Sequence, residues 1–460
     1  MSNDDPEENR LSGRLSRYAR VGANVGGVAA RVAASRLLNR KGDELSNAKA
    51  LTSALGGLKG PLMKVAQLMA TIPDVLPPEY AEELQKLQSD APPMGWAFVK
   101  RRMQSELGQD WESRFDSFEK TPAAAASLGQ VHRAVAKDGL PLAVKLQYPD
   151  MQSAVEADLN QLQILFALHR QIDSAIDTRE IFKEIGARVR EELDYEREAK
   201  HARLYGKILA DTPLVRVPGI RGDLSTKRLL TMEWVTGNKL LTYKGASQED
   251  RNRISEAMFT AWWLPFSRYG VIHGDPHLGN YTVFEEGGRP GGINLLDYGC
   301  VRIFPTRFIG GVMDLYMGLL HNDDARLVHA YETWGFKGLK KELIEVLNIW
   351  ARFIYGPILD DRVRTIAEGV SPGEYGRKEA YRVHQELKKK GPVTVPQEFV
   401  FMDRAAIGLG GVFLHLEAKL NFYQLFNQAI ENFSLAAVEQ RQADALAQVG
   451  LGKNEKTLAG

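Results

Sequence analysis

The feature that most constrains the fold of this 460-residue chain is a short block of strand patterns between two long helical stretches. Residues 129–147, GQVHRAVAKDGLPLAVKLQ, contain two apolar runs joined by Asp138-Gly139, a dipeptide typical of hairpin turns. Two more strand patterns, LVRVPGIRG and RLLTMEWV, follow within residues 214–235. The order predicts an α+β fold with a small lobe of mixed sheet and helix and a larger helical lobe.

The composition is that of a globular protein, with 44% hydrophobic and 25% charged residues and a net charge of +1. No basic excess points to nucleic acid, so we expect no nucleic-acid partner. Cys300 is the single cysteine, which excludes an internal disulfide and suits a reducing cytoplasm. The acidic start MSNDDPEENR and the lack of a long apolar run predict neither a signal peptide nor a transmembrane helix.

Changes of pattern along the chain predict five regions. They are a disordered start and basic amphipathic helix (1–43), an N-terminal helical extension (44–110), a small lobe (111–237), a larger helical lobe (238–440) and a flexible tail (441–460). In the first region, arginines at positions 10, 14, 17 and 20 form a basic stripe on one helix face. This helix could lie on an anionic membrane surface or dock on its own protein, and the sequence leaves both open.

The strongest chemical signal lies at residues 270–299. His273-Gly274-Asp275 is followed five residues later by Asn280, and apolar INLL then leads to Asp297-Tyr298-Gly299. The spacing matches the catalytic loop and the later metal-binding motif of protein kinases. Phosphoryl transfer needs Mg²⁺ on hard oxygen ligands, and Asn280 and Asp297 would supply them. Asp275 would orient, and in a kinase deprotonate, an attacking hydroxyl.

A phosphoryl-transfer reading also predicts a lysine on an early strand and a glutamate on a later helix. Lys145 in LAVKLQ occupies the lysine position, and alternation with Leu142, Val144 and Leu146 directs it away from the apolar face. In REELDYEREAKHA, Asp194 and Glu198 share a helix face, which is unfavourable unless cations lie nearby.

Two sources of positive charge could satisfy these carboxylates. Arg190 and Arg197 could screen them from the same segment, or Lys145 could pair with Glu198, the alternative that we favour. A similar question arises at PLMKVAQLMA, where Lys64 lies in an apolar helical turn with Gln67 close on the same side. Lys64 could extend to water or pair with a buried carboxylate.

Together these segments resemble the UbiB-type atypical kinase family, whose members assist ubiquinone biosynthesis. KVAQ at 64–67 resembles its K-x-G-Q signature, AAASLGQVH at 124–132 its alanine-rich loop and ELD at 192–194 its E-x-D element. HGDPHLGN and LLDYG resemble its catalytic and metal motifs. The resemblance implies an atypical protein-kinase-like fold whose N-terminal helical extension covers the nucleotide cleft.

The resemblance also implies roles for individual residues. Lys64 and Gln67 would meet Glu192 and Asp194 in the space where a protein substrate would lie, and Glu198 would be the partner of Lys145. Ala66, Leu278 and Tyr298 depart from the family pattern without removing a charged or metal-binding group. The chain has no A-P-E element, and little separates Gly299 from the next helical pattern, which argues against a protein kinase.

The motif AAAASLG predicts an alanine-rich loop between the first strands of the small lobe, over the nucleotide phosphates. Alanine retains the backbone N–H donors but disfavours the positive φ angles open to glycine, so we expect a stiffer loop. The residues expected to bind the nucleotide are Ala124, Ala125, Ala126, Ser127, Gly129, Lys145, Glu233 and Val235.

These inferences predict a Mg²⁺- and ATP- or ADP-binding atypical kinase or ATPase that assists ubiquinone biosynthesis. Its expected partners are quinone-biosynthesis proteins and a lipid-like precursor, and its expected location is the cytoplasm, with peripheral contact to the inner membrane as an open point. One alternative is a small-molecule kinase of the aminoglycoside or choline kinase type. Another is a pseudokinase scaffold in which the nucleotide is only a structural clamp.

Overall fold

The computed structural model describes residues 94–126, 128–156, 159, 186–187, 189–336, 339–371, 376–390 and 397–452. The chain forms two compact units. Unit 1 comprises the described residues up to Arg197 together with Arg221–Trp234, and unit 2 comprises Glu198–Ile220 and the described residues from Val235 onward. Each unit is considered by itself below.

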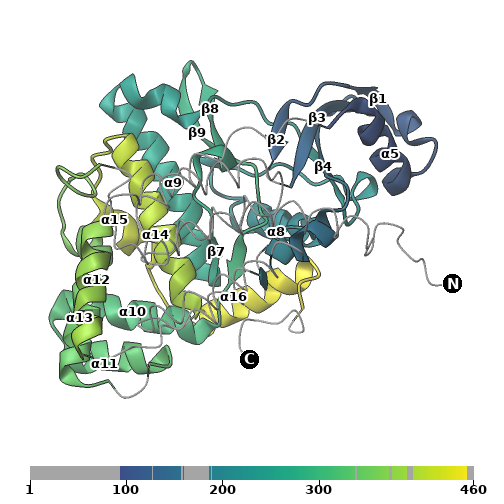
Figure 1. Ribbon diagram of the computed structural model, residues 1–460. Coiled ribbons are helices and arrows are strands. Elements are labelled where there is room, and N and C mark those ends of the chain that lie inside the picture. Colours follow the sequence, from purple (N-terminus) through teal and green to yellow (C-terminus); the bar gives the residue numbers. More distant parts are fainter. Residues whose placement is uncertain are drawn as a thin grey trace, which may run out of the picture. The chain divides into compact units, whose positions relative to one another are not determined.

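Unit 1 is a twisted antiparallel sheet with a helix packed on one face (Figure 1). The strands lie in the order β1-β3-β4-β6, and β2 also pairs with β3. The elements are α5 (Trp96–Leu107), η2 (Trp111–Arg114), β1 (Phe115–Phe118), β2 (Ala124–Ala126), β3 (Gly129–Ala136), β4 (Pro141–Gln147), η3 (Gly222–Leu224) and β6 (Leu229–Glu233). Three of the four strand patterns recognised in the sequence correspond to β3, β4 and β6 of this unit.

Alternation along β4 sets the two faces of the sheet. Leu142, Val144 and Leu146 are fully buried and pack in one cluster with Val99 and Met103 of α5. Since successive residues of a strand point to opposite faces, Lys145 lies on the face away from α5. The predicted orientation of Lys145 is therefore confirmed.

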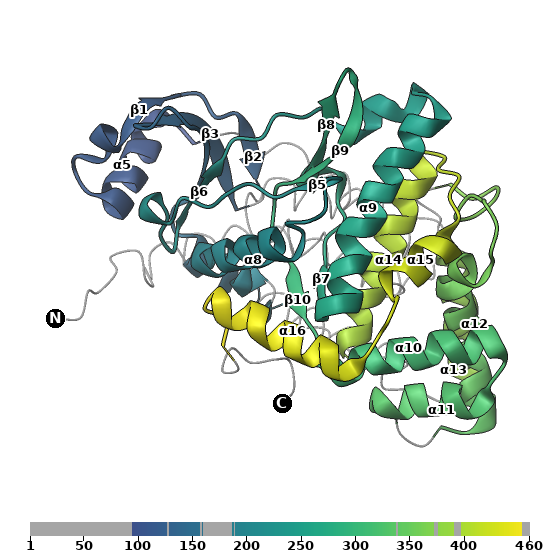
Figure 2. The same cartoon turned by 180° about the vertical axis from the view of Figure 1, so that it is seen from behind.

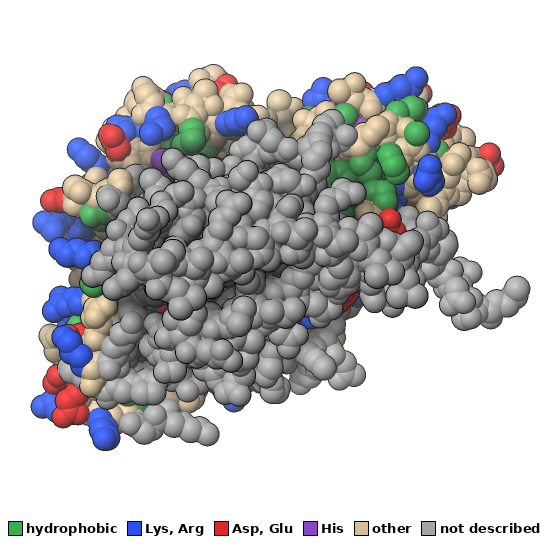
Figure 3. Space-filling model, viewed as in Figure 1, with side chains coloured by type: hydrophobic (Ala, Val, Ile, Leu, Met, Phe, Trp, Pro, Cys, Tyr) green, Lys and Arg blue, Asp and Glu red, His purple; other side chains and the backbone are tan. Residues whose placement is uncertain are grey.

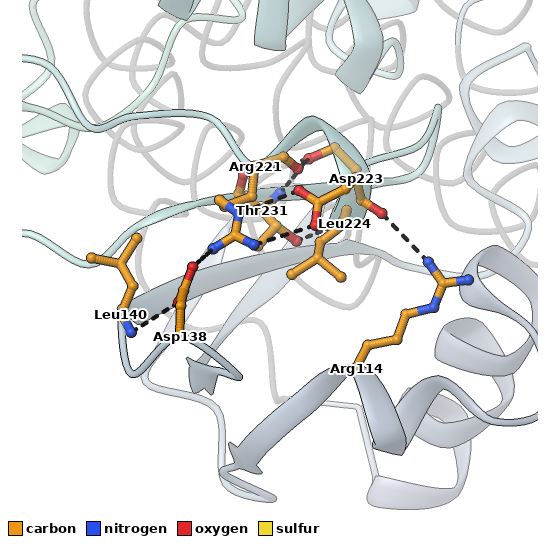
Figure 4. A network of polar contacts seen from close by, with 8 residues as sticks. Arg114, Asp138, Leu140, Arg221, Asp223, Leu224 and Thr231 are labelled. Atoms are coloured by element: carbon orange, nitrogen blue, oxygen red, sulfur yellow. Dashed lines mark hydrogen bonds and ion pairs between the residues drawn. The ribbon is translucent and has the colours of Figure 1, made fainter.

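A polar network fixes the turn between β3 and β4 (Figure 4). Gly139 has φ 83°, which explains the Asp-Gly pair, and the turn is tied to η3 through Arg221. The Arg221 guanidinium lies 2.9 Å from Asp138 Oδ2 and 3.2 Å from Asp223 Oδ1. Arg114 in turn donates to the Asp223 carbonyl. Arg221, the first residue of the second segment of unit 1, therefore holds the hairpin in place.

Unit 2 is mainly helical and carries two small sheets, of order β5-β9-β8 and β10-β7. Its first helix, α8 (Tyr195–Ile208), begins at the end of the first segment of unit 1. The remaining elements are β5 (Val215–Arg216), η4 (Leu240–Gly245), α9 (Gln248–Tyr269), β7 (Val271–His273), η5 (Leu278–Asn280), β8 (Tyr281–Glu286), β9 (Arg289–Leu295), β10 (Val301–Ile303), α10 (Thr306–His321), α11 (Asp324–Thr333), α12 (Lys341–Tyr355), η6 (Gly356–Leu359), α13 (Arg377–Lys390), α14 (Gln397–His415), α15 (Phe422–Ala429) and α16 (Leu435–Gln448). The predicted α+β fold class is confirmed.

Helix α9 is the central element of unit 2, with α14 beside it in both views (Figures 1 and 2). It begins at the N-cap Ser247 and ends at Gly270, whose left-handed φ of 64° lets the chain turn directly into β7. Trp262 and Phe266 of its AWWLPF segment are buried in the core. The hydrophobicity of Trp262 and Phe266 therefore serves folding. Among the described residues, no helix is long and apolar enough to cross a membrane.

The predicted flexible tail differs from the structure at residues 441–448, which form the second half of α16. Val438 and Ala445 are buried on its inner face. Arg441 donates to the Arg268 carbonyl, and Gln442 donates to the carbonyls of Tyr269 and Phe304. The polar side chains that suggested fraying instead satisfy carbonyl groups at the end of α9 and after β10.

The visible surface of unit 2 has no single charge sign. Lys and Arg side chains are interspersed with Asp and Glu along the edge of the view (Figure 3). This distribution agrees with the net charge of +1.

Candidate active site

The candidate catalytic loop follows β7 in unit 2. Asp275 and Asn280 are both half-buried, and η5 brings the chain back so that Asn280 Nδ2 donates to the Asp275 carbonyl at 3.1 Å. The main-chain N–H of Asn280 donates to the His277 carbonyl at 2.9 Å. Because the amide nitrogen of Asn280 is used within the loop, its amide oxygen is the atom suited to a metal.

The second motif joins this loop through the main chain. At the end of β9, the Leu296 N–H donates to the Asn280 carbonyl at 2.9 Å. Asp297 is the next residue, and its Oδ1 accepts from the Gly299 N–H at 3.1 Å. Asp275, Asn280 and Asp297, which the sequence predicts to act together, therefore lie on two segments that are bonded to each other.

His273 links the two aspartates directly. Its Nδ1 accepts from the Asp275 N–H at 3.3 Å, and its Nε2 lies 2.6 Å from the Asp297 carbonyl. Since a carbonyl can only accept, Nε2 must carry the proton, and Nδ1 must be unprotonated to accept from Asp275. His273 is fully buried, with Trp262 and Tyr205 packed around its ring. A neutral imidazole of fixed tautomer thus holds the catalytic and metal motifs together.

Two side chains of helix α8 contact the main chain of Tyr298. The buried Glu198 accepts from the Tyr298 N–H at 3.4 Å, and His201 Nδ1 lies 3.2 Å from the Tyr298 carbonyl, to which it can donate. The two side chains are three residues apart and so lie on one face of the helix. Burial raises the pKa of the Tyr298 phenol well above 10, so it stays neutral. Glu198 therefore positions the residue that follows Asp297.

The close approach of Gly274 to the main chain of Cys300 explains the glycine in HGD. The β7-β10 pair places the Gly274 N–H 3.0 Å from the Cys300 carbonyl, and a Cβ on Gly274 would lie 2.7 Å from the same oxygen. Any side chain here would push the catalytic loop away from the segment after Asp297-Tyr298-Gly299.

In unit 1, Lys145 lies between β3 and β6 in the sheet, opposite Val131 and Leu230. Its Nζ is 5.1 Å from the centre of the Tyr195 ring, a cation–π distance. Tyr195 is buried at the start of α8. The aromatic ring gives the ammonium group a defined position on the face away from α5.

The alanine-rich segment is a strand in the structure, so the prediction that the alanines form the turn was wrong. Ala124, Ala125 and Ala126 make up β2 and pair with Val131, Gln130 and Gly129 of β3. The chain reverses after Ala126, and none of the three has a positive φ. Alanine is compatible with this extended backbone, which explains why glycine is not needed there.

Gly129 is needed for space, at the other end of the same turn. A Cβ on Gly129 would lie 2.2 Å from the Leu146 carbonyl oxygen and 3.0 Å from the Tyr195 hydroxyl. The adjacent Leu128 is buried with Met151 and Ala154. The turn is therefore packed tightly against β4 and the helical residues that follow it.

Gln130 and His132 of the same motif form a buried chain of hydrogen bonds. Met94 N–H donates to Gln130 Oε1 at 2.7 Å, and Gln130 Nε2 lies 2.7 Å from His132 Nε2. His132 Nδ1 lies 2.8 Å from the Glu119 carbonyl and must donate to it, so Nε2 accepts from Gln130. Burial lowers the pKa of His132, which favours this neutral form. These two residues support the hairpin.

A sequence profile of the ABC1 atypical kinase-like domain matches residues 86–331, more than half of the chain. The chain belongs to this family. It is 33% identical to AarF domain-containing protein kinase 1 of Xenopus laevis over 58% of this chain and 52% of that protein. It is 31% identical to the mitochondrial atypical kinase COQ8 of Saccharomyces cerevisiae over 57% of this chain and 52% of that protein. The chain spans about half the length of these curated relatives.

A solved structure is similar to most of this chain. It is the complex of Rv3197 with erythromycin from Mycobacterium tuberculosis, and its superposition covers 90% of this chain and 99% of Rv3197. The sequence identity is 26% and the TM-score is 0.57. The predicted membership of the UbiB-type atypical kinases is confirmed by the family match and by these relatives.

Three charged residues just before α8 and in its first turn make local contacts in the structure. Asp194 Oδ1 accepts from the Arg197 N–H and so caps α8. Arg197 pairs with Glu191 and Arg190 with Glu156. These two ion pairs involve neither Asp194 nor Glu198, so they do not provide the screening that the sequence left open as the alternative to a pair between Lys145 and Glu198.

The remaining predicted site residues lie in both units or outside the described part of the chain. Lys145 and Glu198 belong to different units, so their pairing stays a prediction. Glu233 is the last residue of β6 and pairs with Leu142 of β4. Val235, two residues later, is the first residue of the second segment of unit 2. Glu192 is half-buried ahead of α8. Lys64, Gln67 and Ser127, and the basic helix within residues 1–43, lie outside the described residues.

Two positioning residues were not recognised in the sequence. His201 could have been found, because it follows Glu198 by three residues on the same helix. Tyr281, buried at the start of β8, donates its hydroxyl to the Pro276 carbonyl at 3.2 Å. Its position directly after Asn280 was the available signal.

Proposed function

We propose that this ABC1-family chain is a Mg²⁺- and ATP-dependent atypical kinase or ATPase that assists ubiquinone biosynthesis. The observation that carries the proposal is the linkage of Asp275, Asn280 and Asp297 through the His273 imidazole and the Leu296–Asn280 hydrogen bond. A loop whose Asp and Asn only capped turns would have no need for a buried histidine between two aspartates.

The donor set fits Mg²⁺. The Asp297 carboxylate and the Asn280 amide oxygen are hard ligands from two segments that are bonded together, and Mg²⁺ commonly completes its shell with nucleotide phosphates and water. When bound, the ion would neutralise phosphate charge. His273 and Glu198 keep the Asp297 segment in place for it.

The remaining residues have roles that follow from their positions. Asp275 is half-buried after β7 and would orient a hydroxyl group or water for attack on the nucleotide. Lys145, directed by the sheet and the Tyr195 ring, would bind phosphate oxygens. The turn between β2 and β3 would lie over the phosphates, as in other kinase-like folds.

The proposed pathway rests on the relatives. COQ8 of Saccharomyces cerevisiae is a mitochondrial atypical kinase, and its similarity to this chain supports a role with quinone precursors that are lipid-like. We extend the proposal to peripheral contact with a membrane, where such precursors reside. Comparing quinone intermediates in cells with and without this protein tests the role. Unchanged ubiquinone and no accumulated precursor would rule it out.

The nucleotide chemistry needs a separate test. We expect ATP or ADP with Mg²⁺ to raise the Tm of the full chain, and Asp297→Asn to abolish the Mg²⁺-dependent part of the increase. No increase under any condition would refute nucleotide binding. Robust turnover of a soluble alcohol would favour a small-molecule kinase instead. Full complementation by folded Asp297→Asn would favour a scaffold.

A further inference from the structure

The catalytic loop is supported by a helix beyond residues 86–331, the stretch matched by the family profile. Helix α14 (Gln397–His415) packs on the β7 region of unit 2 and carries a glycine, Gly408, near its middle. Glycine weakens a helix relative to alanine, so a mid-helix glycine calls for a reason in its surroundings.

The reason lies in Pro276, the residue after Asp275. A Cβ on Gly408 would lie 2.4 Å from Pro276 Cγ, and the next two closest atoms, at 3.4 and 3.6 Å, also belong to Pro276. The missing side chain of Gly408 therefore makes room for one residue, the proline of the catalytic loop. Pro276 is buried, as this contact requires.

The clash could not be relieved locally. A proline ring is closed onto its own backbone nitrogen, so moving Cγ by more than a small pucker change moves the main chain of the loop. The Pro276 carbonyl is also held, because Tyr281 donates to it at 3.2 Å. On the other side of Pro276, the Asp275 carbonyl accepts from Asn280 Nδ2. Displacing the ring would therefore disturb both Asp275 and Asn280.

We propose that Gly408 is a positioning residue for the catalytic loop, and that α14 sets the place of Asp275 through the contact with Pro276. This inference rests on the proposed function in one respect, the assignment of Asp275 as the residue that orients the attacking group. It adds that a complete active site requires the helices beyond the family-matched stretch.

The test compares the wild type with three full-length variants. Gly408→Ala should weaken Mg²⁺–ATP binding and slow turnover at least tenfold. Pro276→Ala removes the Cγ that clashes, so the double variant Gly408→Ala/Pro276→Ala should recover much of the loss relative to Gly408→Ala alone. Gly310→Ala on α10 is the matched control, since this half-buried helical glycine has its nearest atom, Leu435 Cδ2, at 3.5 Å. It should bind Mg²⁺–ATP like the wild type.

Hydrogen–deuterium exchange of residues 274–281 separates this proposal from the proposed function. If the wild type shows no response to Mg²⁺ and nucleotide, the proposed function fails, but faster exchange in Gly408→Ala that the double variant reverses would still support the contact. The proposal is overturned if Gly408→Ala matches Gly310→Ala in nucleotide binding and in exchange. It is equally overturned if the double variant is no better than Gly408→Ala.

Discussion

The Nε2–H of His273 donates to the Asp297 carbonyl at 2.6 Å, and this bond joins the two halves of the candidate active site. The same ring accepts from the Asp275 N–H at 3.3 Å. The ring is completely buried, so water cannot replace either partner. One neutral side chain therefore contributes directly to the relative position of the two aspartates.

Replacing this histidine should damage both stability and nucleotide chemistry. His273→Leu leaves a buried N–H and a buried carbonyl without their partner, which we expect to cost about 2–3 kcal/mol of unfolding free energy. Mg²⁺-dependent affinity for ATP should fall roughly tenfold or more, in line with the loss of a supporting interaction at a metal site. Urea unfolding and Mg²⁺–ATP titration measure the two effects. The exposed His329 provides the control variant His329→Leu, which should leave both unchanged.

Gly129→Ala should destabilise unit 1. Its Cβ would lie 2.2 Å from the Leu146 carbonyl, so β3 and β4 would have to separate locally. We expect a loss of about 1–3 kcal/mol, the usual range for overpacking. Gly95→Ala is the comparison, because a Cβ there meets no atom within 4 Å. Equal unfolding midpoints for the two variants would contradict the packing argument.

Replacing Ala124, Ala125 and Ala126 together with glycine should loosen β2. Each glycine in a strand costs about 0.5–1 kcal/mol relative to alanine, mainly through backbone entropy. A looser strand changes the position of the adjoining turn, so we expect altered affinity for ATP or altered selectivity between ATP and ADP. Isothermal titration with both nucleotides is the measurement. Unchanged binding of both would refute the role of the alanines.

His132 should make stability depend on pH on the acidic side. Burial lowers its pKa below 6.5, so the unfolded state takes up a proton at a higher pH than the folded state does. Its contribution is complete above pH 6.5 and is lost as the pH falls below that value. His132→Leu should have a lower free energy of unfolding than the wild type at pH 7.5. This difference in unfolding free energy should become smaller toward pH 5. A gap that stays constant would show that His132 does not titrate in this way.

Asp403 should make the protein less stable as the pH rises, which is the opposite of the effect expected of His132. This carboxyl accepts from Trp350 Nε1 at 2.9 Å, and burial raises its pKa from 3.8 to about 7. Protonation is favoured in the folded state, so the wild type loses stability as the pH rises from about 4 to 7, by at most about 4 kcal/mol. Asp403→Asn keeps an acceptor for Trp350 without the charge. The Tm of Asp403→Asn relative to that of the wild type should increase between pH 5 and 8. A constant difference in Tm over this range would refute the prediction.

Local patterns predicted a good part of the fold and of the site. The orientation of Lys145 follows from alternation along one strand, and the spacing of Asp275 and Asn280 is contained in one loop. The motif Asp297-Tyr298-Gly299 after the apolar INLL also predicted that Asp297 acts together with these two residues. These features depend on neighbours that are close in sequence.

Features that depend on distant neighbours were missed. Nothing near Gly408 in the sequence indicates that its partner is Pro276, more than a hundred residues earlier. Polar residues such as Arg441 and Gln442 suggested a frayed tail because their acceptors at the end of α9 were not visible in the pattern. The alanines were assigned to a turn because a glycine-rich loop occupies that place in ordinary kinases, whereas pairing with β3 makes them a strand.

The fixed tautomer of His273 also gives an internal reporter. A ring proton that is buried and bonded to the Asp297 carbonyl should exchange slowly with solvent and give a resolved imidazole N–H resonance in ¹⁵N-labelled protein. Because that resonance depends on the bond between the two motifs, its broadening would follow their separation in solution. The protein therefore carries its own spectroscopic probe of whether the candidate active site is assembled.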